Sequence, residues 1–418
     1  MKRRRSPKNH GSVEGTVRDL ARGGDGVFDS DLGVVFVAGA FPGDRVRARI
    51  EEVRPSFRRG RVMEVLEAGD SRRASPCEVS GLCGGCPWIA LEPVAQRAAK
   101  AVFVADALSC FDESPGLEWV LGDELAYRRR ARLGWRQGRM GYHRRRRSSL
   151  VDAETCPVLQ PPLENGLKVL RKNVLPMLSG EGELRLARSG EGAVAYLKTD
   201  VQQPPAVYQK LADLVPEHFV GVSFDVEGSV ARFGDASERM THLDGKELVG
   251  PEAGFSQAHD LNEELAKTVA AAAAGEKSVL ELYAGHGNFT VLLAAATKGV
   301  VAVELEEGAT DALRKNLKAR GLKARVVAAD AADYPKPPQG GYDVIVLDPP
   351  RSGAKDVVGR ICSEKLPKRI VYVSCDTATL ARDLKPLADA GFRPTSVQAF
   401  DLFPQTSHVE TLVVLDRE

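Results

Sequence analysis

A cysteine near the carboxyl end of the chain has the residue type and the local setting needed for covalent catalysis. Cys375 lies in RIVYVSCDTATL (residues 369–380). The β-branched and aromatic first half predicts a buried strand, and the leucine spacing after it predicts an amphipathic helix. Cys375 therefore comes at the carboxyl end of a strand, where open α/β sheets place ligands and reactive groups. A thiol there is a candidate nucleophile, although free cysteines are also among the most often buried residues.

A glycine turn and three carboxylates precede this cysteine. From residue 251 onward strands and helices alternate, as in a doubly wound parallel sheet. A predicted strand over 278–283 leads into AGHGNF, whose Gly285 and Gly287 let the backbone approach a ligand. The third glycine of the dinucleotide fingerprint is absent, which argues against NAD. The next three predicted strands each end in a carboxylate, at Glu304, Asp330 and Asp348. This series predicts a fold that binds S-adenosylmethionine. The alternative role of Glu304 is to cap a helix.

Four cysteines form a candidate metal site. Three lie within PCEVSGLCGGCPW and the fourth precedes a proline far along the chain; they are Cys77, Cys83, Cys86 and Cys156. Loops of small residues let several thiolates converge, and four sulfur ligands select zinc or an iron-sulfur cluster. A disulfide is the third alternative, which a reducing compartment disfavours. The residues alone leave zinc and iron-sulfur open.

The amino-terminal residues, 1 to about 68, have the pattern of a small antiparallel barrel. Short alternating segments are separated by glycine and proline. Arg45, Arg47 and Arg49 alternate along one such segment, so they project from one face of a strand. That face suits a phosphate backbone, and ordinary surface charge is the alternative. Further strand-like runs at 184–188, 193–198 and 220–226 predict a second sheet in the middle of the chain.

A net charge of +1 conceals a strongly basic amino-terminal part. Arginine clusters lie at 3–5, 58–61, 128–132 and 144–147. The stretch YRRRARLGWRQGRMGYHRRRR (127–147) also interleaves aromatic residues with arginine, a composition that suits stacking on unpaired bases and binding of phosphates. We therefore expect RNA as a partner.

The composition indicates a soluble globular protein, with 43% hydrophobic and 28% charged residues. No apolar run reaches the roughly 18 residues that a membrane span needs. The basic start lacks the apolar core of a secretory signal, and the irregular cysteine spacing suits a reducing compartment. We expect a cytoplasmic protein with no membrane partner and infer no obligate protein partner.

Taken together, the motifs resemble those of the RNA 5-methyluridine (uracil-C5) methyltransferases. LELYAGHGNFT, VVAVE, VLDPPRSG, VYVSCDTATLARDL and HVETLVVL occur in that family's order. GDGVF, GVVFVAGAFPGDRVRARI and RRGRVMEVL resemble a TRAM domain, an OB-like RNA-binding barrel, and the cysteine spacing resembles the [4Fe-4S] site of the bacterial 23S rRNA branch. The resemblance implies a multidomain chain. It comprises a TRAM-like β-barrel (1–68), an α+β central domain with the iron-sulfur cluster (69–250) and an α/β Rossmann-like methyltransferase domain (251–418), on which part of 91–125 packs.

The resemblance also implies roles for individual residues. Cys375 matches the nucleophile, and Glu410 matches the general base. The positions that match S-adenosyl-L-methionine contacts are Gln257, Tyr283, Asn288, Glu304, Asp330 and Asp348. The positions that match cluster ligands are Cys77, Cys83, Cys86 and Cys156. Tyr283-Ala284 replaces the family's more usual Phe-Cys.

The activity implied by the resemblance is formation of 5-methyluridine in RNA, with 23S rRNA as the expected substrate and tRNA as the alternative. The C5 carbon of uracil needs a thiolate at C6 before it can accept a methyl group, and a carboxylate must then remove the C5 proton. Methylation of an exocyclic nitrogen is a second alternative, which Cys375 and the arginine of Asp-Pro-Pro-Arg disfavour. A third is a non-enzymatic iron-sulfur protein that binds RNA.

Overall fold

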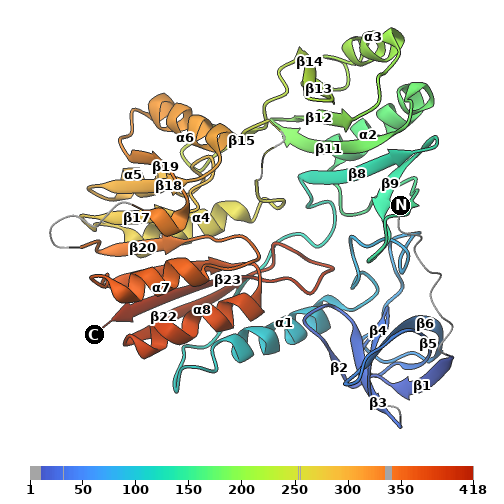
Figure 1. Cartoon of the computed structure of the whole chain (residues 1–418), viewed down its shortest axis with the longest axis horizontal. Coiled ribbons are helices and arrows are strands. Elements are labelled where there is room, and N and C mark those ends of the chain that lie inside the picture. Colours follow the sequence, from blue (N-terminus) through green and yellow to red (C-terminus); the bar gives the residue numbers. More distant parts are fainter. Residues whose placement is uncertain (1–10, 32, 253, 255, 335–340, 418) are drawn as a thin grey trace. The chain divides into compact units, whose positions relative to one another are not determined.

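The computed structural model describes residues 11–31, 33–252, 254, 256–334 and 341–417 (Figure 1). The arginine cluster at 3–5 lies outside this part. The chain divides into two compact units. The first comprises Met1–Phe103, Tyr142–Pro157 and Phe403–His408. The second comprises Val104–Gly141, Val158–Leu402 and Val409–Glu418.

The first unit is built on a six-stranded sheet in the order β1-β5-β6-β4-β3-β2. Its strands are β1 (Ser12–Thr16), β2 (Asp19–Leu20), β3 (Gly26–Ser30), β4 (Gly33–Ala38), β5 (Arg45–Val53) and β6 (Arg58–Glu67). Only the β4–β6 pair is parallel. Val46, Ala48 and Ile50 of β5 are buried in the core. The alternation that buries them turns the arginines between them to the opposite face, as the sequence predicts.

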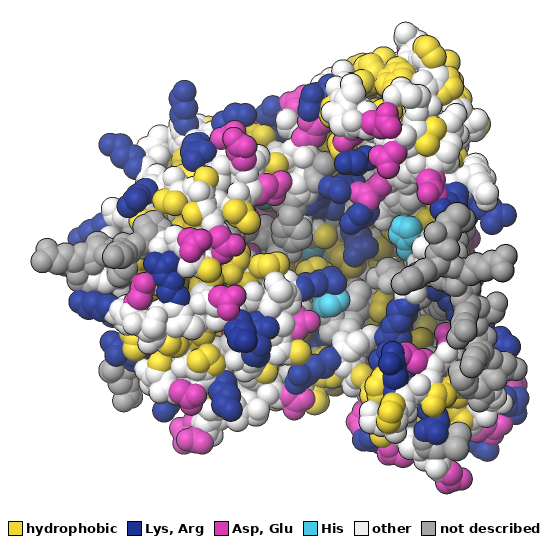
Figure 2. Space-filling view, viewed as in Figure 1, with side chains coloured by type: hydrophobic (Ala, Val, Ile, Leu, Met, Phe, Trp, Pro, Cys, Tyr) yellow, Lys and Arg dark blue, Asp and Glu magenta, His cyan; other side chains and the backbone are white. Residues whose placement is uncertain are grey.

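The arginines on that face of β5 are paired within the sheet. The Arg47 guanidinium lies 2.8 Å from a Glu14 carboxylate oxygen and also contacts Glu64. Arg45 lies 3.2 Å from Glu67. Figure 2 shows the same mixture more broadly, with Lys and Arg side chains lying among Asp and Glu side chains over much of the face in view. The alternative of ordinary surface charge therefore describes Arg45 and Arg47 well.

The segment 403–408, which leads into the last strand, is held in the first unit by buried polar contacts. The Trp88 N–H donates to the Gln405 carbonyl at 2.9 Å. The Gln405 N–H donates to the Gln96 side-chain carbonyl at 2.8 Å, and the Gln96 amide donates back to the Gln405 side chain. Gln96 lies on α1 (Pro93–Ala107). β10 (Leu150–Val151) also lies in this unit and pairs with Tyr142 and His143.

The second unit contains the middle sheet that the sequence predicts. The whole sheet has the order β10-β9-β8-β11-β12-β13-β14, and only β12 and β13 run parallel. The second unit contains β9 as far as Gly141 and the five strands that follow it in this order. Their bounds are β8 (Arg130–Arg136), β9 (Arg139–His143), β11 (Glu181–Ser189), β12 (Gly192–Thr199), β13 (Gly221–Val226) and β14 (Ser229–Gly234). The other elements of this region are α2 (Pro161–Asn173), η1 (Leu175–Met177), α3 (Pro205–Asp213), β15 (Arg239–Thr241) and β16 (Glu247–Val249).

The main sheet of the second unit has eight strands in the order β19-β18-β17-β20-β21-β23-β22-β7. The first five are parallel, which confirms the predicted α/β architecture. β23 runs antiparallel to both of its neighbours. The strands are β7 (Glu118–Val120), β17 (Val279–Leu282), β18 (Val300–Glu304), β19 (Arg325–Ala328), β20 (Val344–Leu347), β21 (Arg369–Ser374), β22 (Phe392–Phe400) and β23 (Glu410–Arg417).

Helices join these strands and complete the core. They are α4 (Asn262–Ala273), α5 (Thr290–Ala296), α6 (Glu307–Arg320), η2 (Ala331–Asp333), α7 (Lys355–Ser363) and α8 (Thr377–Asp389). Leu380, Leu384 and Leu387 of α8 are buried in the core, so the predicted amphipathic helix is confirmed. None of the helices in the described part combines the length and apolar character of a bilayer-spanning helix.

Candidate active site

The register of β21 and β23 brings Cys375 and Glu410 to the same edge of the sheet. Ser374 at the end of β21 lies opposite Thr411 of β23. Cys375 is the next residue after Ser374, and Glu410 is the residue before Thr411, so the pairing brings the two close together across neighbouring strands. The two strands are neighbours in the main sheet.

Asp348 reaches the same edge from the other side of β21. Leu347, the last residue of β20, lies opposite Tyr372 of β21, and Asp348 follows it directly. Arg351 comes three residues later in the same Asp-Pro-Pro-Arg segment and is exposed. The edge thus carries one thiol, two carboxyl groups and one guanidinium within electrostatic reach of one another.

Burial and mutual repulsion shift the pKa values of the side chains at this edge. Glu410 is only 1% exposed, and burial raises its pKa well above the usual range. The charge of Asp348 raises it further, while Arg351 opposes the shift. Burial likewise raises the pKa of the Cys375 thiol to about 12, with Glu410 and Asp348 adding to the shift. The thiol is therefore protonated at neutral pH, and Glu410, once ionised, is a stronger base than an exposed glutamate.

The helix after Cys375 fixes the backbone at the thiol. Asp376 is the N-cap of α8, and its carboxylate accepts hydrogen bonds from the Ala378 and Thr379 N–H groups at 3.0 and 2.9 Å. Such a cap satisfies amide groups that the first turn of a helix leaves unpaired. The nucleophile candidate thus lies between a strand end and a capped helix start, both rigid.

The glycine turn after β17 borders open space. Tyr283 and Gly285 have left-handed backbones, with φ of +65° and +56°. A Cβ built on Gly285 would have no neighbour within 4 Å, whereas one on Gly287 would lie 2.4 Å from Leu313. Gly287 is therefore required for packing against α6, and Gly285 leaves the backbone accessible to a ligand.

The carboxylates at the ends of β18 and β19 also support the local backbone. The Gly285 and Glu306 N–H groups donate to the Glu304 carboxylate at 2.9 and 2.7 Å. Asp330 caps η2 by accepting from the Ala332 N–H at 2.8 Å. The N-cap of α6 is Glu306, so Glu304 does not cap that helix; its carboxylate instead holds the Gly285 turn and the residue before the helix. Each carboxylate still has lone pairs for further hydrogen bonds, because a carboxylate offers about four acceptor positions.

Gln257 and Asn288 differ in what their amides already contact. The side-chain oxygen of Gln257 is buried and has no hydrogen-bond partner in the described part of the chain. By contrast, Asn288 exchanges two hydrogen bonds with the side chain of Asn262, at 2.9 and 3.0 Å. Gln257 therefore has an acceptor available for a ligand, and Asn288 is tied to the first turn of α4.

Comparisons with known proteins agree with this geometry. A family model for tRNA (Uracil-5-)-methyltransferase matches residues 340–418, and one for a methyltransferase domain matches 279–350. The 23S rRNA (uracil(1939)-C(5))-methyltransferase RlmD of Chromohalobacter salexigens is 32% identical over 96% of this chain and 89% of its own length. The same enzyme of Halomonas elongata is 33% identical over 99% of this chain and 91% of its own.

The chain belongs to the RNA uracil-C5 methyltransferase family. A solved structure shares the fold: the Pyrococcus abyssi tRNA (uracil-54, C5)-methyltransferase in complex with S-adenosyl-L-homocysteine has a TM-score of 0.77. It is 22% identical, and the match covers 96% of this chain and all of that one. The family inferred from the sequence motifs is thereby confirmed.

One buried carboxyl at this site was not singled out in the sequence. Glu281 lies within β17, is 2% exposed, and burial raises its pKa to about 8, with the charges of Asp348 and Glu304 adding to the shift. The available signal was an acidic residue inside an otherwise apolar strand, VLEL. Such a carboxyl is protonated at neutral pH and can donate a hydrogen bond.

The four candidate ligand cysteines all belong to the first unit. Burial raises the pKa of the Cys77 thiol, and the charge of Cys156 adds to the shift, so these two lie within electrostatic reach. The Glu78 carboxylate also accepts from the Glu154 N–H at 2.8 Å, which ties the two segments together. Within the described residues, however, no three Cys, His, Asp or Glu side chains are grouped closely enough to hold a metal ion.

The arrangement predicts that Glu410→Gln lowers the pKa of Cys375, because it removes a negative charge that disfavours the thiolate. The rate of iodoacetamide alkylation against pH, followed by mass spectrometry of the Cys375 peptide, measures this pKa. Glu307→Gln, an exposed change on α6, is the control and leaves the profile in place. An unchanged or raised pKa in Glu410→Gln would contradict the assigned proximity.

Proposed function

We propose that this protein transfers a methyl group from S-adenosylmethionine to C5 of a uridine in 23S rRNA. The proposal rests mainly on one observation: Cys375 and Glu410 lie next to each other at the edge of the sheet where β17, β18 and β20 also end. The full-length relatives named for uracil 1939 of 23S rRNA support the equivalent uridine as the target. A tRNA uridine is the alternative, since one matching family model is named for tRNA.

The described residues fit S-adenosylmethionine. Gln257 provides a buried acceptor without a partner, and Gly285 leaves the turn open above its backbone. Glu304 and Asp330 end the next two strands along the edge, where ribose hydroxyls are bound in related sheets. Tyr283 and Asn288 complete the proposed contacts, Asn288 by holding the turn against α4. When bound, the cofactor supplies an electrophilic sulfonium methyl group.

Cys375 begins the proposed reaction. Its thiol releases its proton to solvent as the base binds, and the resulting thiolate sulfur forms a bond to C6 of uracil. The electron pair of the C5–C6 double bond then becomes available at C5, which attacks the methyl group as the carbon–sulfonium bond breaks. Because burial and two carboxyls keep the free thiol protonated, activation depends on the bound base. Uracil must also leave its stack for the sulfur to reach C6.

Glu410 completes the reaction. As a carboxylate it takes the C5 proton, and the electron pair of that C–H bond re-forms the C5–C6 double bond while the bond from C6 to sulfur breaks. The raised pKa of Glu410 makes it a better base than an exposed glutamate. Asp348 adds to the shift and lies on the strand that neighbours β21, so we assign it to orienting the cofactor or the base.

The domain roles follow as part of the proposal. The six-stranded sheet of residues 12–67 is proposed as a TRAM-like RNA-binding barrel within 1–68, followed by a central domain (69–250) and the catalytic domain (251–418). The surplus of positive charge around Asp25 supports RNA contact. Arg145 and Arg146 lie 3.0 and 2.8 Å from its carboxylate, and Arg59 lies 3.6 Å away. Arg59 is also paired with Glu52 at 3.5 Å, but Arg145 and Arg146 still give Asp25 two guanidinium groups for one carboxylate, which leaves charge for phosphate.

We further propose that Cys77, Cys83, Cys86 and Cys156 hold a [4Fe-4S] cluster. Their four thiols are the donor set such clusters use, and none of the cysteines is in a disulfide. The electrostatic contact between Cys77 and Cys156, and the Glu78 hydrogen bonds to residues 154 and 155, support convergence of the two segments. Its role would be to cross-link these segments, which lie about seventy residues apart.

Cys375→Ala is expected to abolish methyl transfer, because no other group in the site can form the bond to C6. S-adenosylmethionine binding should survive, since the thiol is not among the proposed cofactor contacts. Tritium release from C5-labelled uridine in 23S rRNA and tRNA transcripts measures turnover, and calorimetry measures binding. Release from 23S rRNA alone supports the proposed substrate. Normal turnover by the variant would refute covalent catalysis.

Glu410→Gln should accumulate a covalent protein–RNA adduct, because methylation of C5 can proceed while removal of the C5 proton cannot. Denaturing gel electrophoresis with labelled RNA detects the adduct as a retarded band. The double variant Glu410→Gln/Cys375→Ala is the matched control and should give no band. Turnover at the wild-type rate would show that another group removes the proton.

Anaerobically purified protein is expected to be brown and to contain about four irons per chain. Cys156→Ser should lose most of the iron, because it removes one ligand, whereas Cys110→Ser should retain it, since Cys110 belongs to the second unit. Metal analysis and the visible absorption spectrum provide the measurement. A colourless protein that contains zinc would reject the cluster.

A further inference from the structure

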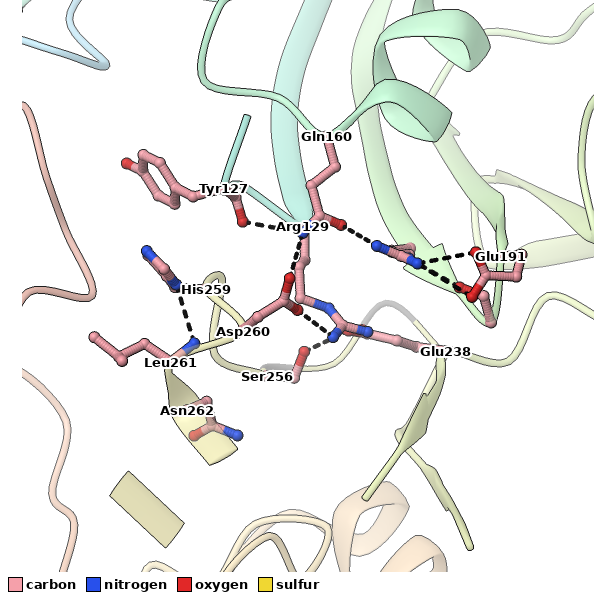
Figure 3. Close-up of polar contacts among 12 residues, drawn as sticks. Tyr127, Arg129, Gln160, Glu191, Glu238, Ser256, His259, Asp260, Leu261 and Asn262 are labelled. Carbon is pink, nitrogen blue, oxygen red and sulfur yellow. Dashed lines mark hydrogen bonds and ion pairs between the residues drawn. The ribbon is translucent and has the colours of Figure 1, made fainter. Parts of the chain in front are cut away.

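Arg129 and Arg130, two arginines of the stretch predicted to bind RNA, instead hold the segment that carries Gln257. Figure 3 shows Arg129 beside Asp260 of this segment. Arg129 is only 7% exposed. Its backbone N–H donates to the Ala258 carbonyl at 2.9 Å. Its guanidinium donates to the Asp260 carboxylate at 2.6 Å. Arg129 therefore fixes the chain on the carboxyl side of Gln257.

Arg130 fixes the same segment on the amino side. Its guanidinium donates to the carbonyl groups of Ser256, at 3.3 Å, and of Gly254. Its Nε lies 3.3 Å from the Glu238 carboxylate, which also accepts from the Ser256 hydroxyl at 2.5 Å. The residues on both sides of Gln257 are thus bound by consecutive residues at the start of β8.

A buried glutamine strengthens the contact at Asp260. Gln160, 4% exposed, donates from its side-chain amide to the second Asp260 oxygen at 2.7 Å. Its own oxygen accepts from Arg188 at 3.0 Å, which fixes the orientation of the amide. The Asp260 carboxylate therefore uses both oxygens to accept hydrogen bonds from the region of the middle sheet, and the charged bond to Arg129 is the stronger of the two.

The neighbouring ring contact restricts the segment further. The Tyr127 ring stacks on His259, with ring centroids 4.8 Å apart and planes at 20°. The His259 ring in turn accepts from the Leu261 N–H at 3.0 Å. Gln257, by contrast, keeps a buried side-chain oxygen without a partner in the described residues. The backbone around it is ordered in advance, while its side chain is left available.

We infer that Arg129 and Asp260, supported by Gln160, are positioning residues that hold Gln257 in place to bind S-adenosylmethionine. This inference rests on the cofactor contact proposed for Gln257. The arrangement lowers the entropy lost on binding, because the segment need not be ordered by the cofactor itself. It also assigns Arg129 to the protein interior rather than to the RNA surface.

Asp260→Asn tests the inference with little change in shape, and the Asp260 side chain is half exposed, so folding is preserved. Loss of one charged hydrogen bond is expected to weaken S-adenosylmethionine binding about tenfold, measured by calorimetry on the full chain. The KM for S-adenosylmethionine should rise accordingly, with kcat nearly unchanged at saturation. Arg132→Gln, on the same strand but paired with Glu183, is the matched control and should bind the cofactor normally.

A double-mutant cycle shows whether the effect passes through Gln257. If it does, Gln257→Ala/Asp260→Asn should bind S-adenosylmethionine no more weakly than Gln257→Ala alone. Wild-type affinity in Asp260→Asn, or fully additive losses in the double variant, would overturn the positioning role. Wild-type affinity in Gln257→Ala would overturn the proposed cofactor contact and, with it, this inference, while the roles of Cys375 and Glu410 would be unaffected.

Discussion

The site depends on holding a thiol and two carboxyl groups close together against their mutual repulsion. Cys375, Glu410 and Asp348 each raise the energy of charging the others, and Arg351 offsets only part of this. Groups of this kind persist only where the surrounding structure holds them, as here by three hydrogen-bonded strands with apolar residues on either side. Burial, with a smaller contribution from the charge of Asp348, gives Glu410 its basicity.

The reversed direction of β23 allows this grouping. In a parallel sheet, ligands gather at the carboxyl ends of the strands. Glu410 is the first residue of its strand, so a parallel β23 would carry it to the opposite edge, far from Cys375. Because β23 runs antiparallel to β21, its amino end meets the carboxyl end of β21.

Local pattern was sufficient to predict much of this arrangement. The strand before Cys375, the helix after it and the turn at Gly285 each follow from hydrophobic period and turn residues within about a dozen positions. Other features depend on residues distant in the sequence, so the residues around each position do not predict them. Examples are the pairing of Asn288 with Asn262 and the burial of Arg129 against Asp260. The charge of an arginine is visible in a sequence, but the carboxylate that neutralises it is not.

An estimate of RNA-binding charge should therefore leave out the arginines that already form ion pairs with carboxylates of the same chain. Arg129 and Arg130 hold the segment that contains Gln257, and Arg45 and Arg47 are matched by glutamates on neighbouring strands. Charge that is already paired releases few counterions when a phosphate approaches, so it adds little to RNA affinity. The guanidinium groups around Asp25 outnumber their carboxylate, and that surplus is a sounder basis for RNA contact than the arginine count of residues 127–147.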